Sequence, residues 1–305
     1  SQFYNASPLI NPALTGFNKG FIQLGGIYRN HLLDLGFQSY AAFVDASLLE
    51  NKLKNDHLGI GALFMYDGVT NGITSQKAQL SLAYHFGFGS NNFLAVGGQV
   101  GLDQNGFSIS GLSTQSQWDP GSGYNPALPT NEPMAEDITF LDYNAGLIWY
   151  SFFDNGSSFF IGGSVFHISE PNTSFLGGTS ALERRYLGHA GIRLAVGSRF
   201  YIIPNGVYMQ QGGFSMINSG LLFEVDVNGT VFVNFGGWLR NTDVLIATTN
   251  IELNNFKIGF SYDHLIGDFN TQNNIGGYEI SLNVLIPKSS KPNINVTGNP
   301  NPDLK

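Results

Sequence analysis

The stretch Lys77-Ala78-Gln79-Leu80-Ser81-Leu82-Ala83-Tyr84-His85-Phe86-Gly87-Phe88 alternates between two kinds of side chain. Its even-numbered residues are apolar, and its odd-numbered residues are mostly polar or small. Because successive side chains of a β-strand point to opposite faces, this segment has one apolar and one polar face. The same alternation recurs in residues 93–103, 256–264 and 278–286. The pattern predicts a sheet with one apolar and one polar side.

About fourteen such segments follow one another along the chain, and each is roughly ten residues long or a little more. This is the length that a tilted strand needs to cross the apolar core of a bilayer. Two of the segments, 157–168 and 199–209, alternate poorly. The predicted strands lie near residues 19–29, 36–48, 57–68, 73–87, 92–103, 137–150, 157–168, 184–197, 199–209, 215–227, 230–240, 243–253, 255–266 and 276–286.

The connections between these segments alternate in length. Every second one is mostly a tight turn, such as Asp154-Asn155-Gly156, Asn228-Gly229 and Asn254-Asn255, although 49–56 is longer. The intervening connections are mostly longer, although 69–72 and 241–242 are short. Short turns at one end and long loops at the other are typical of outer-membrane barrels, whose short turns face the periplasm. The longer connections are residues 30–35, 104–136, 169–183, 210–214 and 267–275.

The composition agrees with a membrane barrel. Charged residues make up 12% of the 305 residues, and the 25 phenylalanines outnumber the 14 lysines and arginines. The net charge of −8 argues against a nucleic-acid partner, and the absence of cysteine excludes disulfides and thiol chemistry. No window has the apolar length of a membrane helix. We therefore predict an all-β fold, a transmembrane antiparallel up-and-down β-barrel of about fourteen strands in the outer membrane.

This barrel divides the chain into three parts. Residues 19–286 form the barrel itself, which must close because an unpaired backbone group in lipid costs several kcal/mol. The lumen of a fourteen-stranded barrel is wide unless something fills it. We expect residues 1–18 to lie in the lumen as a plug, and residues 287–305 to form a flexible periplasmic tail rich in proline and asparagine. The apolar plug residues are Phe3, Tyr4, Leu9 and Ile10.

No catalytic, cofactor-binding or metal-binding constellation stands out. The six histidines include no pair at the spacing of a metal site. A Ser/His pair on the barrel wall, His189 with Ser164 or Ser261, is conceivable for an outer-membrane hydrolase, but ordinary hydrogen bonding in the lumen is the simpler interpretation. The Asp/Asn-Gly clusters lack the acidic spacing of a calcium loop and are explained as turns.

Charged and aromatic residues suggest two further features. Arg184, Arg185 and Arg193 are expected to face the lumen, because a cation on the lipid face at mid-membrane costs about 2–4 kcal/mol. Their expected partners are Glu224, Asp226, Asp263 and Glu279. The loop 104–136 is long enough to be functional, and its composition favours partner contact or capping of the lumen. The candidate partner-binding residues of the long loops are Trp118, Asp119, Tyr124, Phe175 and Phe269.

A set of short motifs, in order over nearly the whole chain, resembles the PorP/SprF family. The first are Ser1-Gln2-Phe3-Tyr4 and Pro8-Leu9-Ile10-Asn11-Pro12-Ala13-Leu14-Thr15-Gly16. Family members often have Leu-Pro before the tyrosine of the eighth strand. This chain departs from that pattern, because its sequence there is Leu182-Glu183-Arg184-Arg185-Tyr186. Further matches are Tyr28-Arg29-Asn30, His167-Ile168-Ser169-Glu170-Pro171-Asn172-Thr173-Ser174-Phe175, His189-Ala190-Gly191, Ile203-Pro204-Asn205, Gln210-Gln211-Gly212, Gly237-Trp238-Leu239-Arg240, Ile258-Gly259-Phe260-Ser261-Tyr262-Asp263 and Tyr278-Glu279-Ile280-Ser281-Leu282.

The resemblance implies an outer-membrane barrel of the type IX secretion system of Bacteroidota. Family members work with secreted cell-surface proteins such as gliding adhesins, and some associate with periplasmic ring and peptidoglycan-binding components. We therefore expect a non-enzymatic barrel without cofactors, which anchors a secreted surface protein or assists its export through its extracellular loops. The C-terminal domain of that partner would contact loops 104–136, 169–183 and 267–275. The alternatives are a diffusion channel or small-molecule transporter, an outer-membrane hydrolase, and a soluble secreted β-sandwich.

Overall fold

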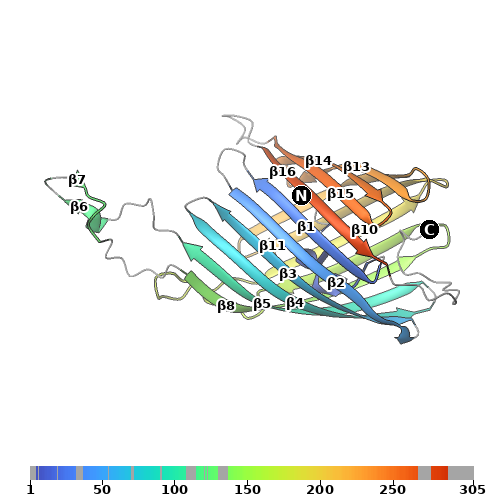
Figure 1. The fold of residues 1–305 in the computed structure, drawn as a ribbon, viewed down its shortest axis with the longest axis horizontal. Helices are drawn as coiled ribbons and strands as arrows, with labels where there is room; N and C mark the ends of the chain where they lie inside the picture. Colours follow the sequence, from blue (N-terminus) through green and yellow to red (C-terminus); the bar gives the residue numbers. More distant parts are fainter. Residues whose placement is uncertain are drawn as a thin grey trace.

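Fourteen antiparallel strands close into a barrel in a computed structural model of the chain (Figure 1). The structure describes residues 5, 7–18, 20–31, 37–53, 55–69, 72–89, 91–107, 115–119, 121, 123–129, 137–266 and 276–287. The barrel strands are β1 (Ile22–His31), β2 (Phe37–Leu53), β3 (Asp56–Val69), β4 (Ile73–Phe88), β5 (Asn92–Phe107), β8 (Asp137–Phe152), β9 (Ser158–Phe166), β10 (Arg185–Ala195), β11 (Phe200–Gln211), β12 (Phe214–Asp226), β13 (Val231–Arg240), β14 (Val244–Leu253), β15 (Phe256–Leu265) and β16 (Gly276–Ile286).

The topology is up-and-down, as predicted. Each strand pairs with its neighbours in the chain, and β1 pairs with β16 from Ile22↔Ile286 to Asn30↔Tyr278, which closes the cylinder. All fourteen predicted strands are present, including the two with poor alternation. Because the barrel is closed, every strand of the ring has a paired neighbour on both sides over at least part of its length. A wall in contact with lipid requires such pairing, since unpaired backbone groups are costly there.

The two faces of the wall are also as predicted. On β4, the side chain of Leu80 is 64% exposed on the outer surface, whereas Ser81 and His85 are buried inside. The exposed residues of the other strands are likewise large and apolar, and the buried ones are mostly Asn, Gln, Ser, His and charged residues. Among the described residues, no helix has the length and apolarity needed to cross a membrane.

Aromatic residues form a band on the outer face near each end of the barrel. Near the long loops, outward-facing tyrosines form a band that we call the tyrosine girdle; Tyr28 and Tyr40 are paired across β1 and β2 with ring centroids 5.1 Å apart. Such bands mark the two membrane–water interfaces of outer-membrane barrels. The girdle consists of Tyr28, Tyr40, Tyr66, Tyr143, Tyr186, Tyr208, Tyr262 and Tyr278, and the band near the short turns includes Phe86, Trp149, Phe153, Phe159, Phe200, Phe223, Phe235 and Phe256.

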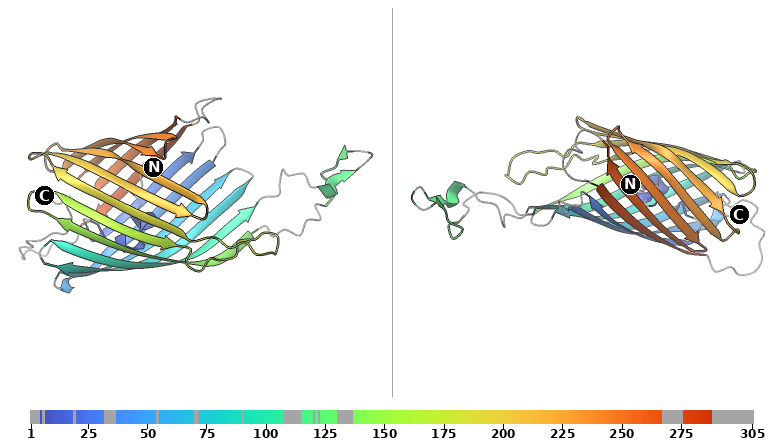
Figure 2. Two further views of the ribbon diagram at one scale, coloured as in Figure 1. Left: turned by 180° about the vertical axis from the view of Figure 1, so that it is seen from behind. Right: turned by 90° about the horizontal axis from the view of Figure 1, so that it is seen from above.

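The wall is taller on one side than on the other. β2, β4, β5 and β8 have 16 or 17 residues and β3 has 14, whereas β9 has 9 and β13, β14 and β15 have 10 each. The additional length of β4, β5 and β8 is at the long-loop end (Figures 1 and 2). There these strands continue past the tyrosines of the girdle, such as Tyr143 on β8. We call this extension, residues 73–77, 103–107 and 137–142, the flap.

Several connections differ from the prediction. The 49–56 loop is wrong, because β2 continues to Leu53 through a register shift and β3 begins at Asp56. Leu49 adopts a positive φ of 65° at this irregularity. Because the register shifts here, the alternation of apolar and polar residues is interrupted and does not reveal the strand. The connection predicted at 210–214 shrinks to Gly212-Gly213. Within the longest loop, the structure adds an unpredicted 3-10 turn, η3 (Gln115–Gln117), and a two-stranded sheet of β6 (Trp118–Asp119) and β7 (Gly123–Tyr124).

Candidate functional site

The N-terminal segment contacts inward-facing residues of the wall. It contains the short helix α1 (Ser7–Ile10) and the 3-10 turn η2 (Pro12–Leu14). Between them, the fully buried Asn11 donates from Nδ2 to the carbonyl oxygens of Leu147 at 3.0 Å and Gly163 at 3.2 Å, while its Oδ1 accepts from the amide of Ala13 at 2.9 Å. One asparagine therefore joins the turn to two neighbouring wall strands.

Wall glycines make room for this close approach. A Cβ added at Gly146 on β8 would lie 1.8 Å from Oδ1 of Asn11, and one at Gly59 on β3 would lie 1.9 Å from the carbonyl oxygen of Thr15. A Cβ added at Gly97 on β5 would also be too close, because it would lie 2.5 Å from the backbone of η2. Any larger residue would collide with the segment, so these glycines shape the inner wall to receive it.

The end of the segment is attached to β2, β3 and β4. Thr15 donates from its hydroxyl to Ser81 at 2.9 Å, and its carbonyl oxygen accepts from Nε2 of His85 at 2.9 Å. His57 stacks on His85 with ring centroids 4.0 Å apart. The carboxylate of Asp45 accepts from the amide of Gly16 at 3.1 Å. Because these partners are buried in the described structure, the contacts hold the segment in one position.

The structure describes part of the segment that is predicted to be the plug. Leu9 packs against Phe43 and Leu63, and Ile10 packs against a cluster formed by three other wall strands. Phe3 and Tyr4 lie outside the described residues. Two residues that were considered as a hydrolase pair, Ser164 and His189, contact the N-terminal segment. Ser164 donates to the carbonyl oxygen of Ile10 at 2.6 Å, and Nε2 of His189 lies 3.0 Å from Nδ2 of Asn11.

One of the predicted ion pairs across the lumen, between Arg193 and Glu224, is present. Arg193 contacts Glu224 at 2.6 Å, and both side chains are 8% exposed. Asp263 pairs instead with Arg29 and Arg240, each at 2.9 Å. The prediction is wrong for Arg184, whose exposed side chain lies at the outer rim and contacts Glu170 at 3.5 Å. Its position near the long loops, next to water, removes the cost of an outward-facing cation.

Glu224→Ala is expected to destabilise the barrel strongly. It removes the carboxylate that lies 2.6 Å from Arg193 and leaves a buried guanidinium without this counter-charge, which costs about 3–5 kcal/mol of the free energy of unfolding. The measurement is the temperature at which the detergent-solubilised barrel loses its folded mobility on a gel. The double variant Arg193→Met/Glu224→Leu is the control and should recover most of the loss, since it removes both charges. Equal losses in the single and double variants would contradict this explanation.

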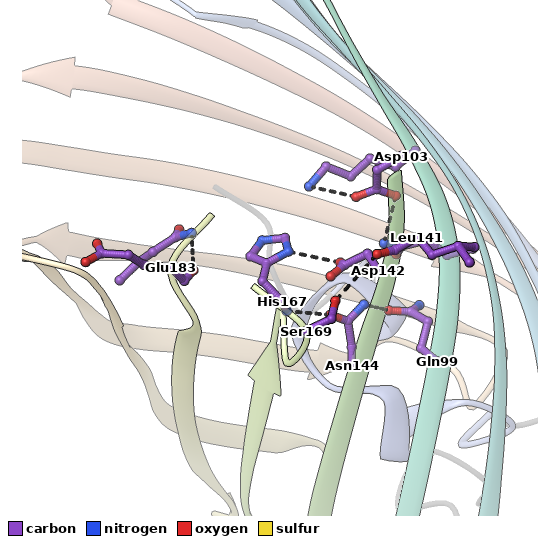
Figure 3. Close-up of polar contacts among 11 residues, drawn as sticks. Gln99, Asp103, Leu141, Asp142, Asn144, His167, Ser169 and Glu183 are labelled. Carbon is purple, nitrogen blue, oxygen red and sulfur yellow. Dashed lines mark hydrogen bonds and ion pairs between the residues drawn. The ribbon is translucent and has the colours of Figure 1, made fainter. Parts of the chain in front are cut away.

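A buried polar cluster lies at the base of the flap, where the loop after β9 begins (Figure 3). Nδ1 of His167 donates to Asp142 at 3.0 Å, and the backbone amide of His167 donates to Oδ1 of Asn144 at 3.0 Å. Lys77 contacts Asp103 at 3.7 Å. Both aspartates are fully buried. The cluster thereby fixes the residue at which the chain leaves the sheet.

The loop between β9 and β10 crosses the inner side of the flap. His167 and Glu170 adopt positive φ angles of 58° and 46°, which turn the chain away from β8. Phe175, a predicted partner-binding residue, then contacts the inward-facing Phe107 of β5 with ring centroids 6.0 Å apart. Where the chain returns, Arg185 lies over the ring of Phe166 at 4.4 Å. The loop thus contacts the inner face of the flap through Phe175.

The remaining predicted site residues lie in the other long loops. Trp118 and Tyr124 face each other across the β6–β7 sheet with ring centroids 6.2 Å apart, and both are exposed. Asp119 stabilises the tight turn between them by accepting from the amide of Gly121 at 2.7 Å. Phe269 lies outside the described residues. Among the residues that the structure describes, no group of three or more acidic, histidine or cysteine side chains is arranged to hold a metal ion.

Comparison with known families explains the ordered motifs. Residues 1–284 match the family described as "Type IX secretion system membrane protein PorP/SprF". The chain belongs to the PorP/SprF family. It is an outer-membrane β-barrel of type IX secretion, which agrees with the resemblance, the fourteen strands and the apolar outer wall. Outer-membrane barrels have their long loops outside the cell and their short turns in the periplasm, and we expect the same orientation for this PorP/SprF barrel.

Solved structures share the fold of this PorP/SprF barrel at low sequence identity. The toluene transporter TodX of Pseudomonas putida has a TM-score of 0.53 and 8% identity, with 92% of each chain covered. The CymD monoaromatic hydrocarbon channel has a TM-score of 0.49 and 10% identity, with 94% of each chain covered. No curated protein matches the chain. At these identities, the likeness to TodX establishes the outer-membrane barrel fold alone.

Proposed function

We propose that this PorP/SprF barrel is a non-enzymatic docking protein that anchors a secreted cell-surface protein or assists its export. The observation that carries the proposal is the bonding of the N-terminal segment to the inner wall. Asn11, Thr15 and Gly16 hydrogen-bond to wall strands from β2 to β9, so the segment acts as a plug that restricts the lumen. A plugged barrel performs its function at its two ends.

The extracellular end offers the surfaces that a protein partner requires. The exposed pair Trp118 and Tyr124 is of the residue types that contribute most at protein interfaces. The flap and the loop containing Phe175 form a further protein surface beyond the membrane. The C-terminal domain of the secreted partner would dock here, and the loops 104–136, 169–183 and 267–275 would all contribute.

The periplasmic end would contact the secretion machinery. Its turns are short and close to the wall, as at Asn254-Asn255 between β14 and β15. We place the other type IX secretion components and peptidoglycan-binding proteins against these turns and against residues 287–305. Outer-membrane lipid covers the apolar wall between the two ends.

Isolation of the native barrel in mild detergent, followed by mass spectrometry, tests this function. We expect one large surface polypeptide to co-isolate with the barrel, together with periplasmic proteins, and we expect low ion conductance in planar bilayers. An unrelated outer-membrane barrel isolated from the same cells is the control. Isolation without any partner, combined with high conductance, would overturn the proposal in favour of a diffusion channel.

A further inference from the structure

The part of β8 that belongs to the flap has a hydrogen-bonded neighbour on one side only. β8 pairs with β5 from Asp137 to Ser151. On its other side, β8 pairs with β9 only from Ala145 to Phe152. Residues 137–144 of β8 therefore extend beyond β9, and this side of the flap is an edge of the sheet.

The loop after β9 does not cover this edge with a strand. The turn at His167 leads the chain inward, and the contact of Phe175 with Phe107 lies on the inner face of the flap. Only the start of the loop reaches the edge. The amide of Ile168 donates to the carbonyl oxygen of Tyr143 at 3.0 Å, and the hydroxyl of Ser169 donates to the carbonyl oxygen of Leu141 at 3.5 Å.

The orientation of the backbone identifies the open hydrogen-bonding groups. The carbonyl of Tyr143 points to the side of β9, because it accepts from Ile168 there. In a strand, the N–H and C=O of alternate residues point to the same side, so those of Leu141 and Thr139 point to the edge too. Within the described chain, no backbone group bonds to Thr139 or to the amide of Leu141 on this side.

The edge lies outside the apolar part of the membrane. Tyr143 belongs to the tyrosine girdle, which marks the outer interface, and Asp137, Thr139 and Leu141 lie beyond it. An open edge would not be tolerated within lipid hydrocarbon, whereas here it is accessible from the cell exterior. Exposed edges are templates for pairing with another chain, and proteins usually block them.

We propose that the edge of β8 from Asp137 to Leu141 binds an extended segment of the partner polypeptide as an added β-strand. The proposal rests on the proposed function and specifies where and how the partner docks. The open groups, which are the amide and carbonyl of Thr139 and the amide of Leu141, recur along the edge about every 7 Å, which is the spacing of alternate residues in an extended peptide. Lipid has no such row of groups.

A second copy of the barrel does not fit this edge. Two barrels inserted with the same orientation carry β8 strands that run in the same direction across the membrane. Their tilts of about 35–45° would make the two edges cross at a large angle instead of lying alongside each other. An extended segment of a different polypeptide has no such restriction, so it is the occupant that the geometry favours.

Photocrosslinking in intact cells tests the site. Benzoylphenylalanine placed at Thr139 should form an adduct with the same polypeptide that co-isolates with the unmodified barrel. Gln76 is the matched control, because it is an exposed, outward-facing flap residue on β4, which is paired on both sides. Equal labelling from Gln76, or a Thr139 adduct with lipid, with a second copy or within the chain itself, would overturn the proposal.

Proline substitution tests the hydrogen bonds themselves. Thr139→Pro removes an amide that points to the edge and none that points to β5, so proline is tolerated there. We expect retention of the partner to fall about fivefold, as for the loss of one hydrogen bond. Thr139→Ala keeps the amide and should retain the partner fully.

The two proposals fail in different ways. Should Thr139→Pro retain the partner fully, with normal folded mobility on a gel, the edge proposal would be wrong while the docking function stands. The docking function fails instead when the unmodified barrel recovers no partner. Adduct formation at Thr139 is measured without the proline, so the edge proposal stays testable even if Thr139→Pro does not fold.

Discussion

Deleting residues 1–16 is expected to convert a poorly conducting barrel into an open pore. The segment bonds to the wall through Asn11 and Thr15, and it packs on the buried side chains of Phe93 and Tyr150 through Ala13. A fourteen-stranded barrel is wider than the small barrels that side chains fill. We therefore expect single-channel conductance in planar bilayers to rise by at least about tenfold, as the lumen approaches that of a porin.

Substitutions in the wall separate displacement of the segment from general damage. Gly146→Val should also raise the conductance, because its Cβ would occupy the position of Oδ1 of Asn11. Gly188→Val, on the outward-facing side of β10, is the control for the same substitution: a Cβ there meets nothing within 4 Å, so the conductance should not change. If the full-length barrel conducts as well as the deletion variant, the segment does not close the lumen.

The barrel itself could be predicted because its determinants are local. Each strand carries its own alternation, so residues such as Leu80 and Ser81 are assigned to opposite faces without knowledge of any neighbour. Turn residues such as Asn254-Asn255 show where one strand ends and the next begins, and so give the lengths of the connections. The pairing order then follows, because consecutive strands of an up-and-down barrel are neighbours.

The features that were missed depend on contacts between distant residues. The flap exists because β8 is seven residues longer than β9, and the end of β9 is fixed by the positive φ of His167 and its bond to Asp142. The alternation in 137–150 says nothing about which of these residues lacks a partner. The fit of Asn11 against Gly146 joins positions 135 residues apart, and frequent glycine in the sequence hides the few that matter.

Replacing residues 108–136 with a short turn should release the secreted partner from cells while the barrel stays inserted. The replacement is structurally feasible, because Gly106 pairs with Asp137 across β5 and β8, so the ends of the loop are adjacent. An Asn-Gly turn suits such a hairpin. The replacement removes Trp118 and Tyr124, and losing two interface aromatics costs at least about 2 kcal/mol, or thirtyfold in affinity.

The amount of partner at the cell surface, relative to the amount of inserted barrel, is the measurement. The double variant Trp118→Ala/Tyr124→Ala keeps the length of the loop and should reproduce most of the loss, because it removes the aromatic contacts alone. The edge of β8 remains in both variants, so a small residual retention that falls further with Thr139→Pro would show two separate contacts. Full retention after the loop replacement would exclude this loop as the docking site.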